Sequence, residues 1–309
     1  MHDGMGFLTQ HAALTSEFEL SLQSVAKTLA VPYWDFTYEG NLVRDAGTLQ
    51  AAWNTPLWSD GSALHHDGSL AWFGEARKSH HAVINGRFAY QTITRDPSYE
   101  VHNAYGYLRA PWNVNKSPFV TRAHEFCNAT IGYSLWPSCG MHWNLTFDPT
   151  YSTWYKWVWD AGYAPHGPMH DYIGGYVNCG NLRSELHNIM PIGAVDDFAK
   201  FMVVLPKSMY RAFLLQPPEY CSDDTPQSQC HTVCSTNPDD PGEVQEMMSI
   251  MMSLASHLSK TGVPVNVDWI ASLDEFKARE LVRVLCTTPF SPGEQLEAGS
   301  PIDVSFWPI

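Results

Sequence analysis

Apolar residues recur with the period of an α-helix over residues 10–30. Members of this stripe lie three or four residues apart, and they are Leu14, Phe18, Leu22, Val25 and Leu29. The spacing predicts an amphipathic helix, and His11, one step before Leu14 on the same stripe, is expected to face the core. We expect the helix to stop at Val31-Pro32, because a residue that precedes a proline disfavours the helical conformation.

Weaker patterns occupy the rest of the chain. Residues 40–150 are rich in Gly, Pro, Asn and aromatic residues with little periodicity, which indicates long loops with short helices or strands. A short helix is predicted at 153–162, and two further helices at about 243–260 and 272–286. The methionines of "EMMSIMMSLASHL" are predicted to fill a core rather than to bind Cu(I) through their thioethers.

Composition limits the classes of function. The 309 residues contain 18 Lys and Arg against 32 Asp and Glu, so the net charge is −14 at pH 7. An acidic surface of this kind repels nucleic acid and anionic membranes, and neither is an expected partner. No apolar run approaches the ~20 residues of a membrane span. Met1-His2-Asp3 has neither the cationic start nor the apolar run of a signal peptide.

Cysteines and glycosylation motifs nevertheless favour an extracellular protein. Three acceptor motifs for N-glycosylation begin at Asn115, Asn128 and Asn144. The seven cysteines are Cys127, Cys139, Cys179, Cys221, Cys230, Cys234 and Cys286. Three of them lie in residues 217–243, which we expect to form a disulfide-bonded loop. The odd number leaves at least one thiol free or paired outside this chain, and the whole pattern predicts a secreted, disulfide-bonded glycoprotein.

The segment "HGPMHDYIGG" places two histidines four residues apart. On a helix this spacing puts His166 and His170 on one face, one turn apart, where a single metal ion can bind both imidazoles. Pro168 is tolerated only in a first helical turn, so the pair is expected at the start of a helix that ends at Gly174-Gly175. An isolated pair of this kind is weak evidence in a chain with 14 histidines.

Two further histidines lie near the N-terminus. His2 and His11 are nine residues apart and would point in opposite directions on one continuous helix. Gly4 and Gly6 interrupt the segment, so His2 can approach from a loop and His11 from the inner face of the following helix. A core histidine that binds no metal is the alternative for His11.

Four stretches in order resemble the tyrosinase family. "HDGMGFLTQHAALTSEFELSL…VPYWDF" is similar to its first copper-binding half, and "HGPMHDYIGG" to the start of its second half. "INGRFAY…YGYLR" between them resembles the family's Gly-x-Phe-Ala segment with its downstream Leu-Arg. "SPIDVSFWPI" resembles the run that precedes the family's last copper ligand, so position 310 is expected to be histidine.

The resemblance implies a fold, a cofactor and a ligand set. The fold would be mainly α, an antiparallel four-helix bundle of the tyrosinase type with long loops and a large helical insertion that contains cysteines. Two type-3 copper ions would be bound by six histidines, of which this chain holds His2 and His11 for one ion and His166 and His170 for the other. The first ligand of the first copper would lie upstream of Met1. Asp303 is the implied hydrogen-bond acceptor for a ligand ring, with Glu19 and Asp35 as weaker candidates.

The same resemblance divides residues 1–309, taken as one domain, into five parts. These are a copper-A part (1–40), a loop-rich middle (41–152), a copper-B start (153–175), an insertion (176–299) and a copper-B end (300–309). The insertion is far longer than the usual family gap, and His187 within it is expected at the surface rather than on the metal. Gln10-His11-Ala12 also departs from the family's usual Trp-His-Arg.

Three functions remain open at this point. The resemblance implies an oxidoreductase that converts phenols or o-diphenols to o-quinones with dioxygen. An extracellular structural or filament-forming glycoprotein with a vestigial copper site, which self-assembles through other parts of a longer chain, is the alternative. An oxygen carrier with the same two-copper chemistry is a third possibility.

Overall fold

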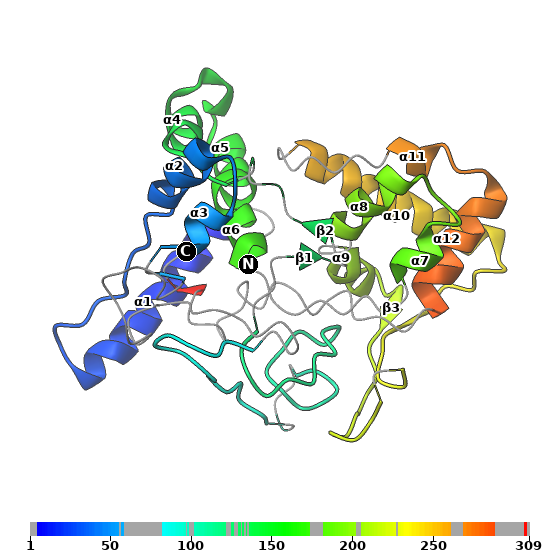
Figure 1. Cartoon of the computed structure of the whole chain (residues 1–309), viewed down its shortest axis with the longest axis horizontal. Helices are drawn as coiled ribbons and strands as arrows, with labels where there is room; N and C mark the ends of the chain where they lie inside the picture. The colour runs from blue at the N-terminus through cyan, green and yellow to red at the C-terminus, as the bar shows by residue number, and fades with distance from the viewer. Residues whose placement is uncertain are drawn as a thin grey trace.

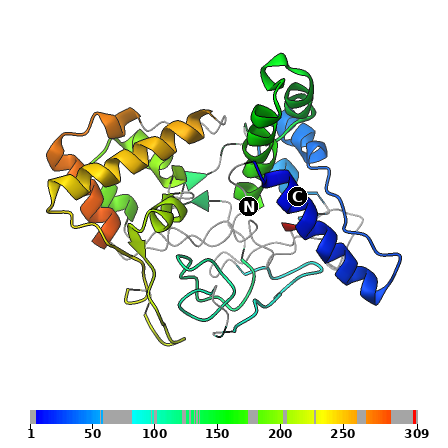
Figure 2. The same cartoon turned by 180° about the vertical axis from the view of Figure 1, so that it is seen from behind.

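The computed structural model of the chain has a mainly helical fold (Figure 1), as the sequence predicts. It describes residues 5–55, 57–58, 82–96, 98, 102–121, 125–126, 129–130, 132, 134, 136–173, 182–201, 205–226, 228–260, 268–287 and 306–307. Two groups of helices lie at opposite ends of the molecule, with loop segments between them (Figures 1 and 2). Within the described residues no helix is both long enough and apolar enough to cross a bilayer.

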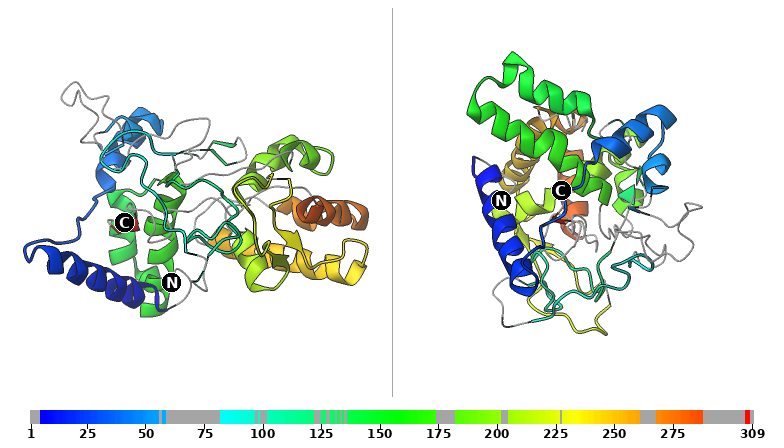
Figure 3. Two further views of the ribbon diagram at one scale, coloured as in Figure 1. Left: turned by 90° about the horizontal axis from the view of Figure 1, so that it is seen from below. Right: turned by 90° about the vertical axis from the view of Figure 1, so that its left-hand side faces the viewer.

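The first group of helices comes from the N-terminal part of the chain. Its members are α1 (Phe7–Val25), α2 (Thr37–Ala46), α3 (Gln50–Trp53), α4 (Cys139–Phe147), the short turn η2 (Pro149–Tyr151), α5 (Trp154–Ala161), η3 (Gly162–His166) and α6 (Gly167–Ile173). The second group comprises α7 (Leu182–Leu186), α8 (Ile192–Phe201), α9 (Leu205–Arg211), α10 (Pro241–Lys260), α11 (Asp268–Ala271) and α12 (Glu275–Thr287). Figure 3 shows both groups from two further directions.

The strands described are short and form two antiparallel pairs. In the first, β1 (Glu125–Phe126) pairs with β2 (Ala129–Thr130), and Phe126 lies opposite Ala129. In the second, β3 (Leu215–Gln216) pairs with β4 (Val233–Cys234), and Leu215 lies opposite Cys234. The second pair encloses the cysteine-rich loop that the sequence predicts.

Helix α1 ends at Val25, five residues before the predicted end at residue 30. The stripe is half-buried as far as Leu22, but Val25 is 84% exposed and Leu29 is 42% exposed. The reason is a side-chain contact, because the carboxylate of Glu19 accepts hydrogen bonds from the backbone N–H of Val31 and from Gln23. These bonds fold the following segment back along the helix and compete with further helical turns.

The helix that carries the histidine pair is continuous, which corrects the predicted start at Pro168. Residues Trp154–Ile173 form one helix in which Gly162–His166 make a π-helical turn with Pro165 inside it. A proline in a regular α-helix clashes with the carbonyl group four residues earlier, and a wider turn relieves that clash. Isolated π-helical turns of this type are frequent at functional sites.

An aromatic cluster packs behind α6 and fixes its position. Its buried members are Trp34, Phe36, Val43, Leu49, Ala52, Trp58, Trp136, Met169, Tyr172 and Ile173. The hydroxyl group of Tyr172 donates to the backbone oxygen of Gly132 at 2.7 Å, and the indole N–H of Trp136 donates to the backbone oxygen of Phe36 at 2.9 Å. Burial of these rings accounts for most of the stabilisation that holds α2, α3 and α6 together.

Glu39 lies in this cluster with 2% of its surface exposed. Its carboxylate accepts a hydrogen bond from the indole N–H of Trp34, but burial raises the pKa of Glu39 above its ordinary 4.5. The folded protein therefore holds this proton more strongly than the unfolded chain, and stability is lost as the pH rises through the folded-state pKa.

We expect Glu39→Gln to raise the melting temperature at pH 7 but to leave it unchanged at pH 4. Glutamine keeps an acceptor for the Trp34 N–H and cannot ionise, so it avoids the cost of burying a carboxylate. Thermal unfolding of both proteins from pH 4 to pH 8 measures the difference. A constant difference across this range would contradict the assignment of the effect to ionisation of Glu39.

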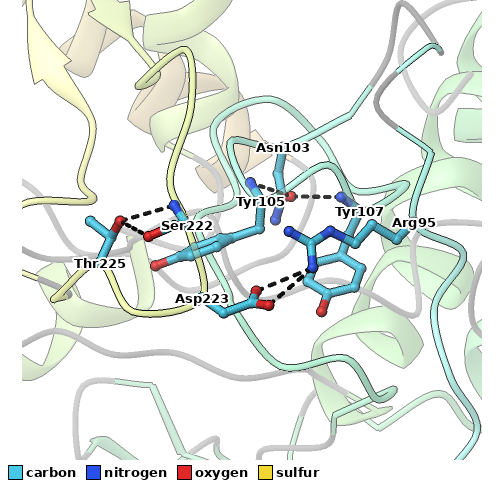
Figure 4. Close-up of polar contacts among 7 residues, drawn as sticks. All are labelled: Arg95, Asn103, Tyr105, Tyr107, Ser222, Asp223 and Thr225. Carbon is cyan, nitrogen blue, oxygen red and sulfur yellow. Dashed lines mark hydrogen bonds and ion pairs between the residues drawn. The ribbon is translucent and has the colours of Figure 1, made fainter.

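The loop-rich middle of the chain holds the cysteine-rich loop in place (Figure 4). The guanidinium group of Arg95 forms an ion pair with Asp223 at 3.1 Å, and the backbone N–H of Cys221 donates to the backbone oxygen of Ala104 at 2.9 Å. The side-chain oxygen of Asn103 accepts from the backbone N–H groups of Tyr105 and Tyr107, which fixes the turn between them. The ion pair and the bond between Cys221 and Ala104 join segments more than a hundred residues apart in sequence.

Helices α7–α12 surround a hydrophobic core of their own. Its buried residues include Val195, Phe198, Phe201, Met247, Met251 and Leu281. Disulfide bonds join Cys221 to Cys230 and Cys234 to Cys286, and the second of these ties the loop to α12. Core filling by methionine is confirmed for Met247 and Met251, which are 0% exposed. The predicted insertion at 176–299 stays a prediction, but a separate core supports it.

Candidate metal centre

Three of the four predicted ligand histidines belong to the described residues, and the structure brings them together. His166 and His170 lie on consecutive turns of the helix that ends at Ile173, and their Nε2 atoms are 2.7 Å apart. At this distance one ring N–H donates to the lone pair of the other ring, and a metal ion bound to both nitrogens would replace that hydrogen bond. The pair therefore points at one position, as the spacing of four residues predicts.

His11 approaches the pair from α1. Its ring centroid lies 5.4 Å from that of His166, with the two planes nearly perpendicular. The Nδ1 atom of His11 lies 2.7 Å from the backbone oxygen of Phe7, which in the neutral ring places the hydrogen on Nδ1 and the lone pair on Nε2. Burial lowers the pKa of His11 below its ordinary value, and this favours the neutral form that binds metals.

Phenylalanine rings surround the histidines, a feature that the sequence analysis missed. The ring of Phe7 lies 4.5 Å from His11 and 5.0 Å from His166, and it is 6% exposed. Phe7 precedes His11 by four residues, and this helical spacing is the sequence signal that could have placed the two rings side by side. A Cβ atom at Gly162 would lie 3.4 Å from the Phe7 ring, an ordinary van der Waals contact, so α1 packs directly against this turn.

The C-terminal segment reaches the same place. The Phe306 ring stacks over His11 with centroids 6.1 Å apart and lies 6.5 Å from His170, and Phe306 is 6% exposed. Trp307 stacks on Phe18 of α1 at 3.8 Å. Phe306 and Trp307 therefore pack on α1, the helix that carries His11. Figure 2 shows the red segment that contains them beside α1.

Several predicted positions are not part of the cluster. His2, Asp303 and Asn128 lie outside the described residues, so their roles stay predictions. Glu19 binds the loop that follows α1, and Asp35 accepts hydrogen bonds from the backbone and hydroxyl of Thr37 at the start of α2. Among the described residues neither carboxylate accepts a hydrogen bond from a predicted ligand histidine.

The glycosylation motifs differ in accessibility. Asn115 is 2% exposed, and its side chain accepts from the backbone N–H of Ser117 and lies 3.5 Å from Thr121. This burial argues against a glycan at Asn115 in the folded protein, and the glycan stays a prediction. Asn144 on α4 is exposed, and a glycan at this position stays a prediction. His187 is exposed at the surface, as expected.

The residues present fit a metal site in part. Two imidazole nitrogens point at one position and a third imidazole lies beside them, and neutral imidazole is a good ligand for copper. Within the part of the chain that the structure describes, no group of three or more His, Cys, Asp or Glu side chains is arranged to hold a metal ion. Cys139, the free cysteine among those described, is exposed at the start of α4.

The fold and the cluster together define a helical protein with a histidine-based candidate metal centre. A comparison with family descriptions matches residues 1–195 to the common central domain of tyrosinase. This match covers 195 of the 309 residues, so the chain belongs to the tyrosinase family. No curated protein and no solved structure matches the chain.

Proposed function

We propose that the protein is a copper-dependent oxidoreductase that converts phenols or o-diphenols to o-quinones with dioxygen. The observation that carries the proposal is the convergence of His166 and His170, with His11 packed against them, in a member of the tyrosinase family. His166 and His170 would hold one copper ion. His11 and His2 would belong to the site of the other.

Copper bound at these histidines would supply the electron transfer between phenol and dioxygen. The chain's own residues set the geometry. The backbone oxygen of Phe7 orients the His11 ring, and the rings of Phe7 and Phe306 pack against the imidazoles. The aromatic cluster behind Met169 and Tyr172 prevents the helix of the histidine pair from shifting.

We further propose that the protein is extracellular. Among the described residues two disulfide bonds are present, and Asn144 is an accessible acceptor for a glycan. Reducing conditions would remove the link between Cys234 and Cys286 that ties the loop to α12. Mass spectrometry of peptides that contain Asn144 would detect the glycan.

Oxygen uptake tests the activity directly. Protein loaded with copper is expected to consume dioxygen when 4-tert-butylcatechol is added and to form the coloured o-quinone, whereas Phe276→Ala, at an exposed position on α12, should behave like the wild type. Copper-loaded protein that takes up no dioxygen with catechols or monophenols would contradict the proposal and favour the structural alternative.

A further inference from the structure

A cleft lies in the second group of helices, away from the histidine cluster. It runs between α10, α11 and the first turns of α12 and has a volume of about 620 Å³. Small-molecule sites typically have volumes of ~300–1,000 Å³. Figure 1 shows these helices at the opposite end of the molecule from α1 and α6. The cleft also lies beyond residue 195, where the match to the tyrosinase domain ends.

The floor of the cleft is a methionine-lined stripe of α10. Val244, Met248 and Met252 follow one another at intervals of four residues and line the cleft. Met247 and Met251, on the neighbouring stripe, are completely buried in the core. The methionines of α10 thus divide into a pair that fills the core and a half-buried pair that faces the cleft.

Small side chains on the facing wall leave the cleft open. Ile270 and Leu273 extend the apolar surface, while Ala271 and Ala278 lie among them and occupy little volume. A larger residue at 278 would project from α12 toward the methionines of α10.

The rim of the cleft is polar but carries little net charge. Arg279 and Glu275 line it, and their side chains form an ion pair at 3.6 Å. The Arg279 side chain is 37% exposed and that of Glu275 is 75% exposed. Gln245 and Ser249 on α10 contribute an amide and a hydroxyl group. The opposite charges compensate each other, so the rim favours a ligand that is neutral and can form hydrogen bonds.

We propose that this cleft binds a small neutral aromatic molecule that carries a hydroxyl group, the chemical class of a phenol. Thioether sulfur atoms make favourable contacts with aromatic rings, and a guanidinium plane attracts and stacks on their faces. The cleft presents both, because the thioethers of Met248 and Met252 and the guanidinium group of Arg279 line it. A hydroxyl group on the ligand would bond to the polar rim. An anion is disfavoured by Glu275 and by the net charge of −14.

The site does not depend on copper, so its test is separate from that of the proposed oxidase activity. The full chain, labelled with ¹³C at the methionine methyl groups, is titrated with 2-naphthol under nitrogen, so that no oxidation takes place. The methyl signals of Met248 and Met252, assigned with Met248→Leu and Met252→Leu, are expected to shift and to saturate. Removal of copper with a chelator should leave this binding unchanged.

Substitutions in α12 locate the binding. We expect Ala278→Phe to fill the cleft and weaken the affinity for 2-naphthol at least tenfold. Arg279→Gln should weaken it about threefold through loss of the cation–π contact. Arg283→Gln is the matched control, because Arg283 lies one turn further along α12, pairs with Asp239 and is not among the cleft-lining residues. It should bind like the wild type.

Three results would overturn the proposal. The first is an unchanged affinity in folded Ala278→Phe, and the second is a loss of binding when copper is removed, since the probe would then report on the histidine cluster. The third is tighter binding of naphthalene-2-sulfonate than of 2-naphthol, which would show that the cleft selects an anion. Saturable shifts of the methyl signals limited to Met248 and Met252, together with weaker binding of 2-naphthol in Ala278→Phe, would establish the proposed site.

Discussion

Replacement of His170 with alanine is expected to remove at least half of the copper from the purified protein and to lower catechol oxidation at least ~100-fold. His170 is 5% exposed, and its Nε2 atom lies 2.7 Å from that of His166. A single remaining imidazole cannot hold the ion with comparable affinity, because each ligand adds to binding and fixes the geometry of the others. Elemental analysis and oxygen uptake measure the two effects.

His187→Ala serves as the control for this experiment. His187 lies 17 residues further along the chain and is exposed at the surface, so its removal should change neither copper content nor activity. Circular dichroism and thermal unfolding establish that His170→Ala is folded. Folded His170→Ala with the full copper content of the wild type would show that the pair does not bind the metal.

Phe198→Ala is expected to destabilise the second group of helices by ~3–5 kcal/mol. The Phe198 side chain is 0% exposed, and it packs against Phe201 and Trp269 with centroids 5.8 and 5.5 Å away. Its truncation leaves a cavity in the core that α7–α12 share. Because that core is separate from the aromatic cluster around Trp136, we expect these helices to unfold at lower denaturant concentration while copper stays bound.

Phe276→Ala is the matched control, since the Phe276 ring on α12 is 68% exposed. We expect its free energy of unfolding to stay within ~0.5 kcal/mol of the wild type. Denaturant titrations monitored by helical circular dichroism and by retained copper distinguish unfolding of the second group of helices from unfolding of the first. Simultaneous loss of both signals in Phe198→Ala would mean that the chain unfolds as one cooperative unit.

Much of the helical structure could be predicted from local patterns. The stripe that includes His11 predicts α1, and the apolar spacing of 243–260 and 272–286 predicts α10 and α12 nearly to their observed bounds. These elements follow from burial of one face, which leaves a periodic signal in the sequence. Helix ends were less accurate, because the bonds from Val31 and Gln23 to Glu19 that accompany the end of α1 are side-chain contacts without periodicity.

Features that depend on contacts distant in sequence could not be predicted in this way. The pairing of Cys234 with Cys286 spans 52 residues, and cysteine positions alone allow many connectivities. The same holds for the ion pair of Arg95 with Asp223. Pro168 predicts a helix start, whereas the structure continues the helix through a π-helical turn at Pro165, because a wider turn accommodates proline and has no sequence signature of its own.

In the candidate site, too, local spacing could be predicted from the sequence, whereas contacts between distant segments could not. A spacing of four residues predicts that His166 and His170 share a face, and the structure confirms it. The stacking of Phe306 on His11 depends on the fold of the whole chain, so only the family resemblance of its segment indicated that it belongs near the metal. The burial of Asn115 could not be inferred from its glycosylation motif, which describes three residues and not their environment.

Anomalous diffraction at the copper absorption edge, from crystals of the copper-loaded protein, tests most directly whether His166 and His170 bind copper. We predict a peak ~2 Å from the Nε2 atoms of both residues, on the side that faces the His11 ring. Copper-loaded crystals with no peak between these two imidazoles, or with the metal bound only elsewhere, would contradict the account.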